Sequence, residues 1–393
     1  MSNVQRGTPQ PQQPVVIINP GPRTGVGPWT ELLASRPGLA LVDAAVAERV
    51  GAALPRDCVV LTVERSPSIK DVEHTVIHIK EHSPRTVLAV GGGATMDLAK
   101  LAVLAAETPR LVEHLQDATR EDGLVPLHST RRSRRLILAP TTPGTGSEMT
   151  IGACVDHPLA TGERARSLVT GTALGADLAW IDAELLTTLP TVLVREGAVE
   201  ALSRVLVSSV ATPTTLRPAD WEAHALARHL TSLLLEVNSV ETATFRTLQD
   251  LALTSGQTHR GLSLTGRGPA PSPVWFIATE LSMVLGVRKD TALSALLAQW
   301  IRLVSDGVEA WGDAEVLEAI LPADSPGRWA LTEASPLPAP PGTVWRTIER
   351  VRNRWGGQRP MMGRFRDEEI AALLEPAVQT IAQPVRRTEP AHA

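Results

Sequence analysis

The sequence predicts an α/β domain followed by an all-α domain. In the first half, short β-branched runs alternate with helix-length segments, which is typical of a mostly parallel sheet covered by helices on both faces. After residue 190 the strand signals fade, and the apolar residues follow helical spacing instead. The 393 residues are enough for two domains. We expect the α/β domain at 15–188 and the helical domain at 189–383, with a disordered tail at 1–14 and a flexible tail at 384–393.

The individual elements are predicted in chain order from their apolar patterns. The predicted strands are 15–19, 39–43, 58–63, 86–90, 135–140 and 178–182. In the second half, 220–238 and 276–311 have the apolar spacing of helices. Segments rich in Pro, Gly and Ser, at 261–274 and 321–342, are predicted to be loops between helices.

Composition excludes several classes of function. The formal net charge is −4, so we expect a small molecule or a peptide as partner and no nucleic acid. The chain has only two cysteines, Cys58 and Cys154, which excludes a disulfide framework and a cysteine-based zinc site. Residues 1–14 lack the apolar core of a signal peptide, and no segment has the apolar length of a membrane span. We therefore expect a cytoplasmic protein with no membrane partner.

Three consecutive glycines follow the predicted strand 86–90 and precede a helix. A turn of this kind points backbone N–H groups and the positive end of the helix outward, which suits a pyrophosphate. Gly91, Gly92 and Gly93 are needed there because a side chain would block close approach. The alternative, for this motif alone, is a tight strand-to-helix turn without a ligand.

A second polar turn, at 139–150, follows the predicted strand 135–140. It combines hydroxyl side chains with Gly144 and Gly146. Ligands of α/β proteins bind at the carboxyl ends of the strands, where both turns are expected to lie. The two turns together therefore favour a nucleotide site over two turns without a ligand.

These residues resemble the iron-type (group III) alcohol dehydrogenases of the dehydroquinate synthase-like fold, and the resemblance spans nearly the whole chain. The family's first motif is present from Gly91 to Lys100, with Ala94 in place of a serine. Its second motif is intact from Pro140 to Glu148 and favours a dehydrogenase over the cyclases of this fold. The resemblance implies an NAD-binding domain whose cofactor-binding residues are Gly91, Gly92, Gly93, Asp97, Thr141, Thr142, Thr145 and Arg166.

The nucleotide is expected to be NAD. Asp43 ends the predicted strand 39–43, where a carboxylate can accept hydrogen bonds from the adenosine ribose and would repel a 2′-phosphate. NADP is therefore disfavoured. The alternative is that Asp43 only caps the next helix.

In the resembling family, an Asp and three His bind a divalent metal that polarises the substrate oxygen. The corresponding positions of this chain hold Glu200, Arg204, Trp275 and Lys289. A guanidinium has no lone pair to offer a metal. The sequence therefore predicts that this metal site is lost and that no metal is bound there.

The spacing of the other histidines indicates whether they can bind a metal. His259 is the nearest histidine to the expected site, and it has no partner histidine at the family's spacing. His74, His78 and His82 recur every four residues, so they share one helix face and have the spacing of a chelate. They belong to the α/β domain, away from the expected cleft, and an exposed helix face without a metal is the favoured interpretation.

Without the metal, hydride transfer needs other groups to stabilise the alkoxide. The candidate catalytic residues are Lys289, Arg204 and Glu200. Burial beside an arginine is expected to lower the pKa of Lys289, which would let it accept a proton near neutral pH. The alternative is a structural ion pair of Glu200, with either Arg204 or Lys289, that only fills the vacated space.

A cation left free in this cleft would attract a carboxylate, which favours a hydroxy acid or a peptide C-terminus as substrate. The dehydrogenases of daptide-type ribosomal peptide biosynthesis, a branch of the same family, are associated with such an oxidation at a peptide terminus. We therefore expect an NAD-dependent dehydrogenase that acts on a hydroxyl or carbonyl group. The alternative is a non-catalytic homologue that binds NAD or a partner as a scaffold or regulator. Homodimers are common in the family, so a homodimer is one expectation.

Overall fold

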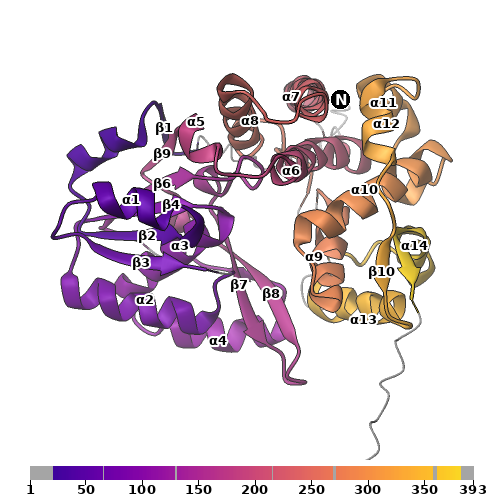
Figure 1. Cartoon of the computed structure of the whole chain (residues 1–393). Coiled ribbons are helices and arrows are strands. Elements are labelled where there is room, and N and C mark those ends of the chain that lie inside the picture. The colour runs from indigo at the N-terminus through magenta and orange to yellow at the C-terminus, as the bar shows by residue number, and fades with distance from the viewer. Residues whose placement is uncertain are drawn as a thin grey trace, which may run out of the picture.

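The computed structural model describes residues 21–64, 66–128, 131–214, 216–268, 271–356 and 361–381. Over these residues the chain folds into an α/β domain and a largely helical domain, which lie side by side (Figure 1). This confirms the predicted fold class. The predicted strand 15–19 and the tails 1–14 and 384–393 fall outside the described residues. Within them, no helix is long and apolar enough to cross a membrane.

A six-stranded parallel sheet forms the centre of the α/β domain. Its strands lie in the order β1-β9-β6-β4-β2-β3. All but β1 coincide with predicted strands to within one residue. β1 is short and mostly exposed, so it lacks the apolar run by which the other strands were predicted. The bounds are β1 Arg23–Val26, β2 Leu39–Asp43, β3 Val59–Val63, β4 Thr86–Gly91, β6 Arg135–Pro140 and β9 Leu178–Ile181.

A smaller, three-stranded sheet extends from this domain toward the helical half. β7 (Gly152–Pro158) and β8 (Arg164–Thr170) form an antiparallel hairpin, and β5 (Leu124–Pro126) pairs with β8 in parallel. Along β8, buried residues alternate with partly or fully exposed ones. The sequence analysis missed these strands because they have no continuous apolar run.

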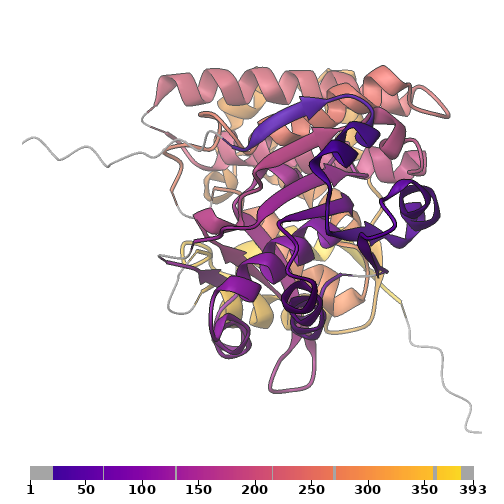
Figure 2. The ribbon, with the colours of Figure 1, turned by 90° about the vertical axis from the view of Figure 1, so that its left-hand side faces the viewer.

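Helices cover both faces of the six-stranded sheet (Figure 2). Side chains alternate along each strand, so Leu39 and Leu41 of β2 pack into the core that α2, α3 and α4 complete. Ala40 and Val42 point to the opposite face, where α1 and α5 pack. The helices are α1 Ala47–Ala53, α2 Ile69–His82, α3 Gly93–Glu107, α4 Leu111–Glu121 and α5 Ala183–Leu186.

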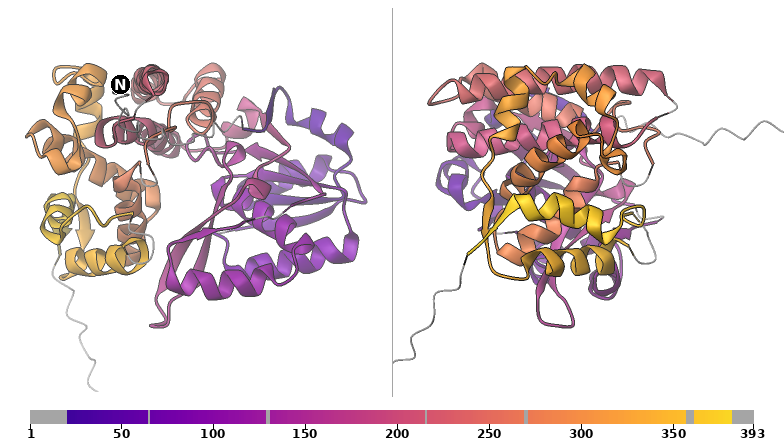
Figure 3. Two further views of the ribbon diagram at one scale, coloured as in Figure 1. Left: turned by 180° about the vertical axis from the view of Figure 1, so that it is seen from behind. Right: turned by 90° about the vertical axis from the view of Figure 1, so that its right-hand side faces the viewer.

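The second half is built around one apolar core of helices (Figure 3). The predicted helical stretch 276–311 is divided into two helices, because Gly286 ends the first with a left-handed φ of 68°. β10 (Leu337–Ala339) and β11 (Val378–Thr380) form a short parallel pair, which departs from the all-α prediction. The helices are α6 Thr191–Ala211, α7 Arg217–Asn238, α8 Phe245–Gln257, α9 Pro273–Leu285, α10 Lys289–Ser305, α11 Ala314–Ile320, α12 Pro326–Thr332, α13 Thr343–Trp355 and α14 Asp367–Leu374.

The strand order identifies where a ligand would bind in the α/β domain. After β2 the chain moves outward to β3 at the sheet edge, whereas after β4 it moves the other way to β6. The carboxyl ends of β2 and β4 therefore flank a topological switch point, where α/β sheets open a crevice. Asp43 ends β2 and the glycine turn follows β4. The predicted domain boundary, after residue 188, falls between α5 and α6.

Candidate active site

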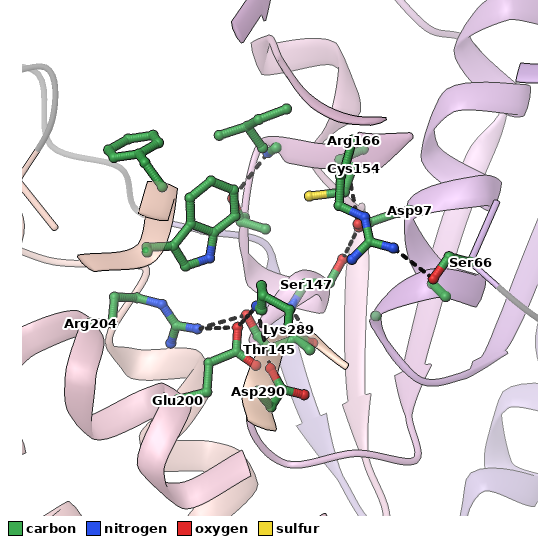
Figure 4. A pocket seen from close by; sticks show the side chains of 18 of the residues that line it. Ser66, Asp97, Thr145, Ser147, Cys154, Arg166, Glu200, Arg204, Lys289 and Asp290 are labelled. Carbon is green, nitrogen blue, oxygen red and sulfur yellow. Dashed lines mark hydrogen bonds and ion pairs between the residues drawn. The ribbon is translucent and has the colours of Figure 1, made fainter. Parts of the chain in front are cut away.

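A cavity of about 750 Å³ lies between the two domains, within the size range of ligand pockets (Figure 4). The turns after β4 and β6 and the β7–β8 hairpin form one wall, and α6, α9 and α10 form the other. The structure thus brings predicted cofactor-binding and catalytic residues to one space. The predicted residues that line the cavity are Gly93, Asp97, Thr145, Arg166, Glu200, Arg204 and Lys289.

The first glycine turn leaves the N-terminus of α3 without a side-chain cap. Gly92 is the N-cap residue, and within the part of the chain that the structure describes no side chain forms a capping hydrogen bond there. A Cβ on Gly93 would lie 2.9 Å from Cγ2 of Thr145, so glycine is required for the close packing of the two turns. The buried hydroxyls of Thr95 and Thr142 have no partner among the described residues. The turn thus offers unpaired donors that fit an anionic group.

A buried polar network fixes the second turn beneath the first. The Asp97 carboxylate accepts a hydrogen bond from the Ser147 hydroxyl (2.5 Å) and one from the Cys154 backbone N–H (2.8 Å). Lys100 Nζ donates to Ser147 Oγ and to the Gly152 carbonyl, both at 2.8 Å. Asp97 therefore positions the loops with both of its oxygens, although it also borders the cavity.

Arg204 ties the second turn to the helical domain. Its guanidinium donates to the carbonyl oxygens of Gly144 and Thr145, both at 3.1 Å, and to the Thr258 hydroxyl at 2.6 Å. Its contact with the Glu200 carboxylate is longer, at 3.7 Å. Arg204 is therefore held mainly by the carbonyl groups of the second turn, and its cation is not free for a substrate carboxylate.

Lys289 is the closer partner of Glu200. Its ammonium group forms an ion pair with Glu200, lies 3.5 Å from the Asp290 carboxylate and stands 5.6 Å from the centre of the Trp275 ring. Burial lowers the pKa of Lys289, but the two carboxylates outweigh burial and raise the pKa above its ordinary value. The predicted lowering of this pKa is therefore wrong, because the expectation considered the neighbouring arginine and not the two acids.

Asp290 is a cavity residue that the sequence analysis missed. Burial and the charge of Glu200 raise the pKa of Asp290 from 3.8 to about 7. Burial also works against ionisation of Glu200, but Lys289 and Arg204 outweigh it and lower that pKa to about 2. Glu200 is thus a fixed anion, and Asp290 titrates near neutral pH. Its position next to Lys289 was the available signal.

The other predicted cofactor residues lie at the carboxyl edge of the sheet or have structural partners. Asp43 accepts a hydrogen bond from the Ala45 N–H at 3.0 Å, so it caps the following turn as the alternative interpretation proposed. Arg166 forms a two-point ion pair with Asp156, at 2.7 and 3.2 Å, and donates to Ser66 at 2.9 Å. Arg166 therefore borders the cavity with its charge already compensated.

The α/β domain matches the family model of the iron-containing alcohol dehydrogenases over residues 31–183. Over these residues the chain is similar to the iron-containing alcohol dehydrogenases. The long-chain-alcohol dehydrogenase 1 of Geobacillus thermodenitrificans is 31% identical over 157 residues, which are 38% of this chain. The match spans only 36% of that relative's length.

Solved structures extend the likeness to the helical domain. The YqhD protein of Escherichia coli K-12 superimposes with a TM-score of 0.73 at 17% identity, over 92% of this chain and 98% of that one. NADH-dependent butanol dehydrogenase A of Thermotoga maritima superimposes with a TM-score of 0.71 at 17% identity, over 94% of this chain and 99% of that one. These likenesses confirm the fold.

The residues at the expected metal positions do not fit the metal of the iron-containing alcohol dehydrogenases. Arg204 and Trp275 have no lone pair to coordinate a cation, and Lys289 is protonated in its ion pair with Glu200. His259 makes a 2.9 Å contact from Nε2 to the Thr145 carbonyl. Among the described residues, the cluster of metal-ligating side chains lies on α2, outside this cavity.

Proposed function

We propose that the chain is an NAD-dependent dehydrogenase that oxidises or reduces a hydroxyl or carbonyl substrate in the interdomain cavity without the metal of its relatives. The observation that carries this proposal is the cluster of Glu200, Lys289 and Asp290. The cluster holds a protonated amine at a position where the resemblance implies a metal ligand, on the cavity wall opposite the two turns that are proposed to bind the nucleotide.

The nucleotide would be held at the glycine turn. The unpaired N–H groups at the start of α3 and the hydroxyls of Thr95 and Thr142 suit the pyrophosphate. Asp43 ends β2 beside the switch point, which supports NAD over NADP. Its capping bond uses Oδ1 and is compatible with a ribose contact through the other oxygen.

The bound nicotinamide would supply a hydride acceptor, and the chain's residues would handle the charge and the proton. Lys289 has three N–H donors, so it can keep its ion pair with Glu200 while donating to the substrate oxygen. That donation stabilises the alkoxide. Asp290, with a pKa of about 7, is suited to take up the alcohol proton near neutral pH.

The lining of the cavity supports an anionic substrate. Five basic side chains face three acidic ones in it, and Trp275 and Phe276 add an aromatic wall. Each of these cations already has a partner, since Arg164 and Arg166 pair with Asp156 and Arg288 pairs with Glu196. The supporting feature is therefore the number of N–H donors that line the cavity and not a net charge. We propose hydroxy acids as substrates, including a peptide with a C-terminal Thr, as in daptide-type biosynthesis.

A non-catalytic NAD-binding homologue is the second candidate. It is favoured because each cation of the cavity has a partner, as expected of structural ion pairs.

We also propose a cytoplasmic location and a homodimer. Cys58 and Cys154 are both free thiols, which fits a reducing compartment.

The decisive variant is Lys289→Met, which keeps the apolar stem and removes the charge. Wild-type protein should bind NAD and form NADH with β-hydroxy acids or peptides ending in Thr. Lys289→Met should lower kcat by about 100-fold or more, with NAD affinity unchanged. Lys70→Met, at an exposed lysine on α2, is the matched control and should retain full activity. NAD binding without turnover of any such substrate would favour the non-catalytic homologue.

A further inference from the structure

α2 carries a group of side chains that can bind a metal, and none of them lines the interdomain cavity. His74, His78, Glu81 and His82 occupy positions i, i+4, i+7 and i+8 of this helix. Residues at these spacings project from one face. His74, Glu81 and His82 are exposed, and His78 between them is partly buried. The face is therefore open to a small ion from solvent.

The separations on this face match those of metal ligands. The Nε2 atoms of His74 and His78 lie 3.3 Å apart. Two nitrogens bound to one tetrahedral zinc, each at 2.0–2.1 Å, would lie about 3.3 Å apart. On the other side of His78, ligand atoms of His78, Glu81 and His82 all lie within 4.8 Å of one another. His78 is thus the common member of both groups.

The helix presents these side chains on a fixed backbone. α2 begins with a reciprocal capping box between Ser68 and Asp71. Val72, Val76 and Ile79 are buried in the core on its opposite face. The backbone cost of bringing the ligands together has therefore been met by folding, which favours chelation.

Within the described part of the chain, one ring nitrogen of His78 has a hydrogen-bond partner and the other has none: Nε2 shares a hydrogen bond with Nε2 of His74. Nδ1 of His78 is buried and has no hydrogen-bond partner among the described residues. Its separation from the Glu81 carboxylate, 3.9 Å, is too long for a hydrogen bond and leaves room for adjustment around an ion. Imidazole nitrogens with one carboxylate suit zinc and similar divalent transition metals.

We propose that α2 binds one divalent transition-metal ion of the zinc type through His78, Glu81 and His82, with His74 next to this site. This site is independent of the dehydrogenase proposal, and it has a consequence for it. Zinc found in the purified protein belongs on α2 and does not by itself indicate a metal in the interdomain cavity.

Zinc titration of the full-length, chelator-treated protein tests the proposal. Wild-type protein should bind one equivalent of zinc, and His78→Ala should weaken binding by about tenfold or more, since loss of outer partners alone costs about 10- to 100-fold. His82→Ala should also weaken it. His114→Ala, at an exposed histidine on α4, is the matched control and should bind zinc as wild type does.

Cobalt and NAD provide two further readouts. Cobalt bound to the wild type should show the visible absorption of a low-coordinate site, and His78→Ala should lose it. NAD affinity should be equal in both proteins, which shows that the variant is folded and separates this site from the nucleotide site. Equal zinc affinity in wild type and His78→Ala, or equal loss in His114→Ala, would overturn the proposal.

Discussion

Lys289 lies between two carboxyl groups whose pKa values are shifted in opposite directions. Glu200 is an anion over the whole physiological range, because its pKa is lowered to about 2 by Lys289 and Arg204 against the effect of burial. Burial and the charge of Glu200 raise the pKa of Asp290 to about 7. The ammonium group therefore stays charged whether or not Asp290 carries a proton, so one residue can hold charge while its neighbour exchanges a proton.

The pKa of Asp290 predicts a pH-dependent difference in stability between Asp290→Asn and wild type. The folded wild type keeps a proton that the unfolded chain releases above its ordinary pKa of 3.8. Asp290 therefore costs no stability below about pH 4 and progressively more up to about pH 7. Asn does not titrate, so the variant should gain stability relative to wild type across that window and level off above it.

Urea unfolding at several pH values measures this difference. Glu148 and His157, whose pKa values are displaced to about 7 and about 4, are present in both proteins and cancel in the comparison. A difference that stays constant from pH 4 to pH 8 would show that Asp290 is ionised like an ordinary aspartate.

Among the elements, α3 depends on the close approach of its first turn to the loop after β6. In Gly93→Ala the new Cβ would lie 2.9 Å from Thr145 Cγ2, so one of the two turns must move. Overpacking of this kind costs about 1–3 kcal/mol. NAD affinity should fall by about tenfold, the equivalent of 1.4 kcal/mol, as measured by calorimetric titration.

A glycine with free space provides the control. A Cβ on Gly51, within α1, would meet no atom within 4 Å. Gly51→Ala should therefore raise stability by about 0.4–1 kcal/mol and leave NAD affinity unchanged. Equal NAD affinity in Gly93→Ala and wild type would contradict the role given to the turn.

A second element contact joins the helical domain to the β7–β8 hairpin. Glu280 on α9 is fully buried and accepts hydrogen bonds from Nε of Arg350 (2.9 Å) and of Arg354 (3.0 Å), both on α13. The same arginines donate to the carbonyls of Arg164 and Arg166 on β8, at 3.0 and 2.9 Å. This network joins α9 and α13 to β8, which forms part of the cavity wall. Arg204 likewise joins α6 to the second turn.

Glu280→Gln should destabilise the protein by about 3 kcal/mol or more, because it leaves the buried guanidinium group of Arg354 without an anion and Arg350 with only Glu163. Glu184→Gln is the matched control: Glu184 also pairs with an arginine, Arg49, but both side chains of this pair are more than a third exposed. Its loss should cost less than about 1 kcal/mol. Chemical denaturation measures both values, and similar small losses would argue against the network.

For the molecule as a whole, sequence patterns predicted the parts with strong local signals. The apolar runs of β2, β4 and β6 predicted the fold, and the glycine turns are the basis of the proposed nucleotide site. The hairpin of β7 and β8 escaped prediction because its alternating pattern is weak in a sequence rich in arginine. Whether a strand was predicted therefore depended on how strong its pattern is within a few consecutive residues.

The charge state of the site depended on contacts between distant segments. Glu200 and Lys289 are brought together by the packing of α6 on α10, and Asp290 comes with Lys289. No local pattern gives the balance of burial against those charges, which reversed the expected pKa shift of Lys289. The commitment of Arg204 to the Gly144 and Thr145 carbonyls likewise appears only in the folded chain.

We propose that this chain, which is similar to the iron-containing alcohol dehydrogenases, works with Lys289 in place of a metal. The most direct measurement is the metal content and NAD-dependent turnover of His78→Ala protein purified without oxygen and treated with chelator. The α2 site is removed in that variant, so any remaining stoichiometric metal would belong to the cavity. We predict no stoichiometric iron or zinc and undiminished NADH formation. Stoichiometric metal in this variant, with turnover that is lost on chelation and restored by the metal, would contradict the account.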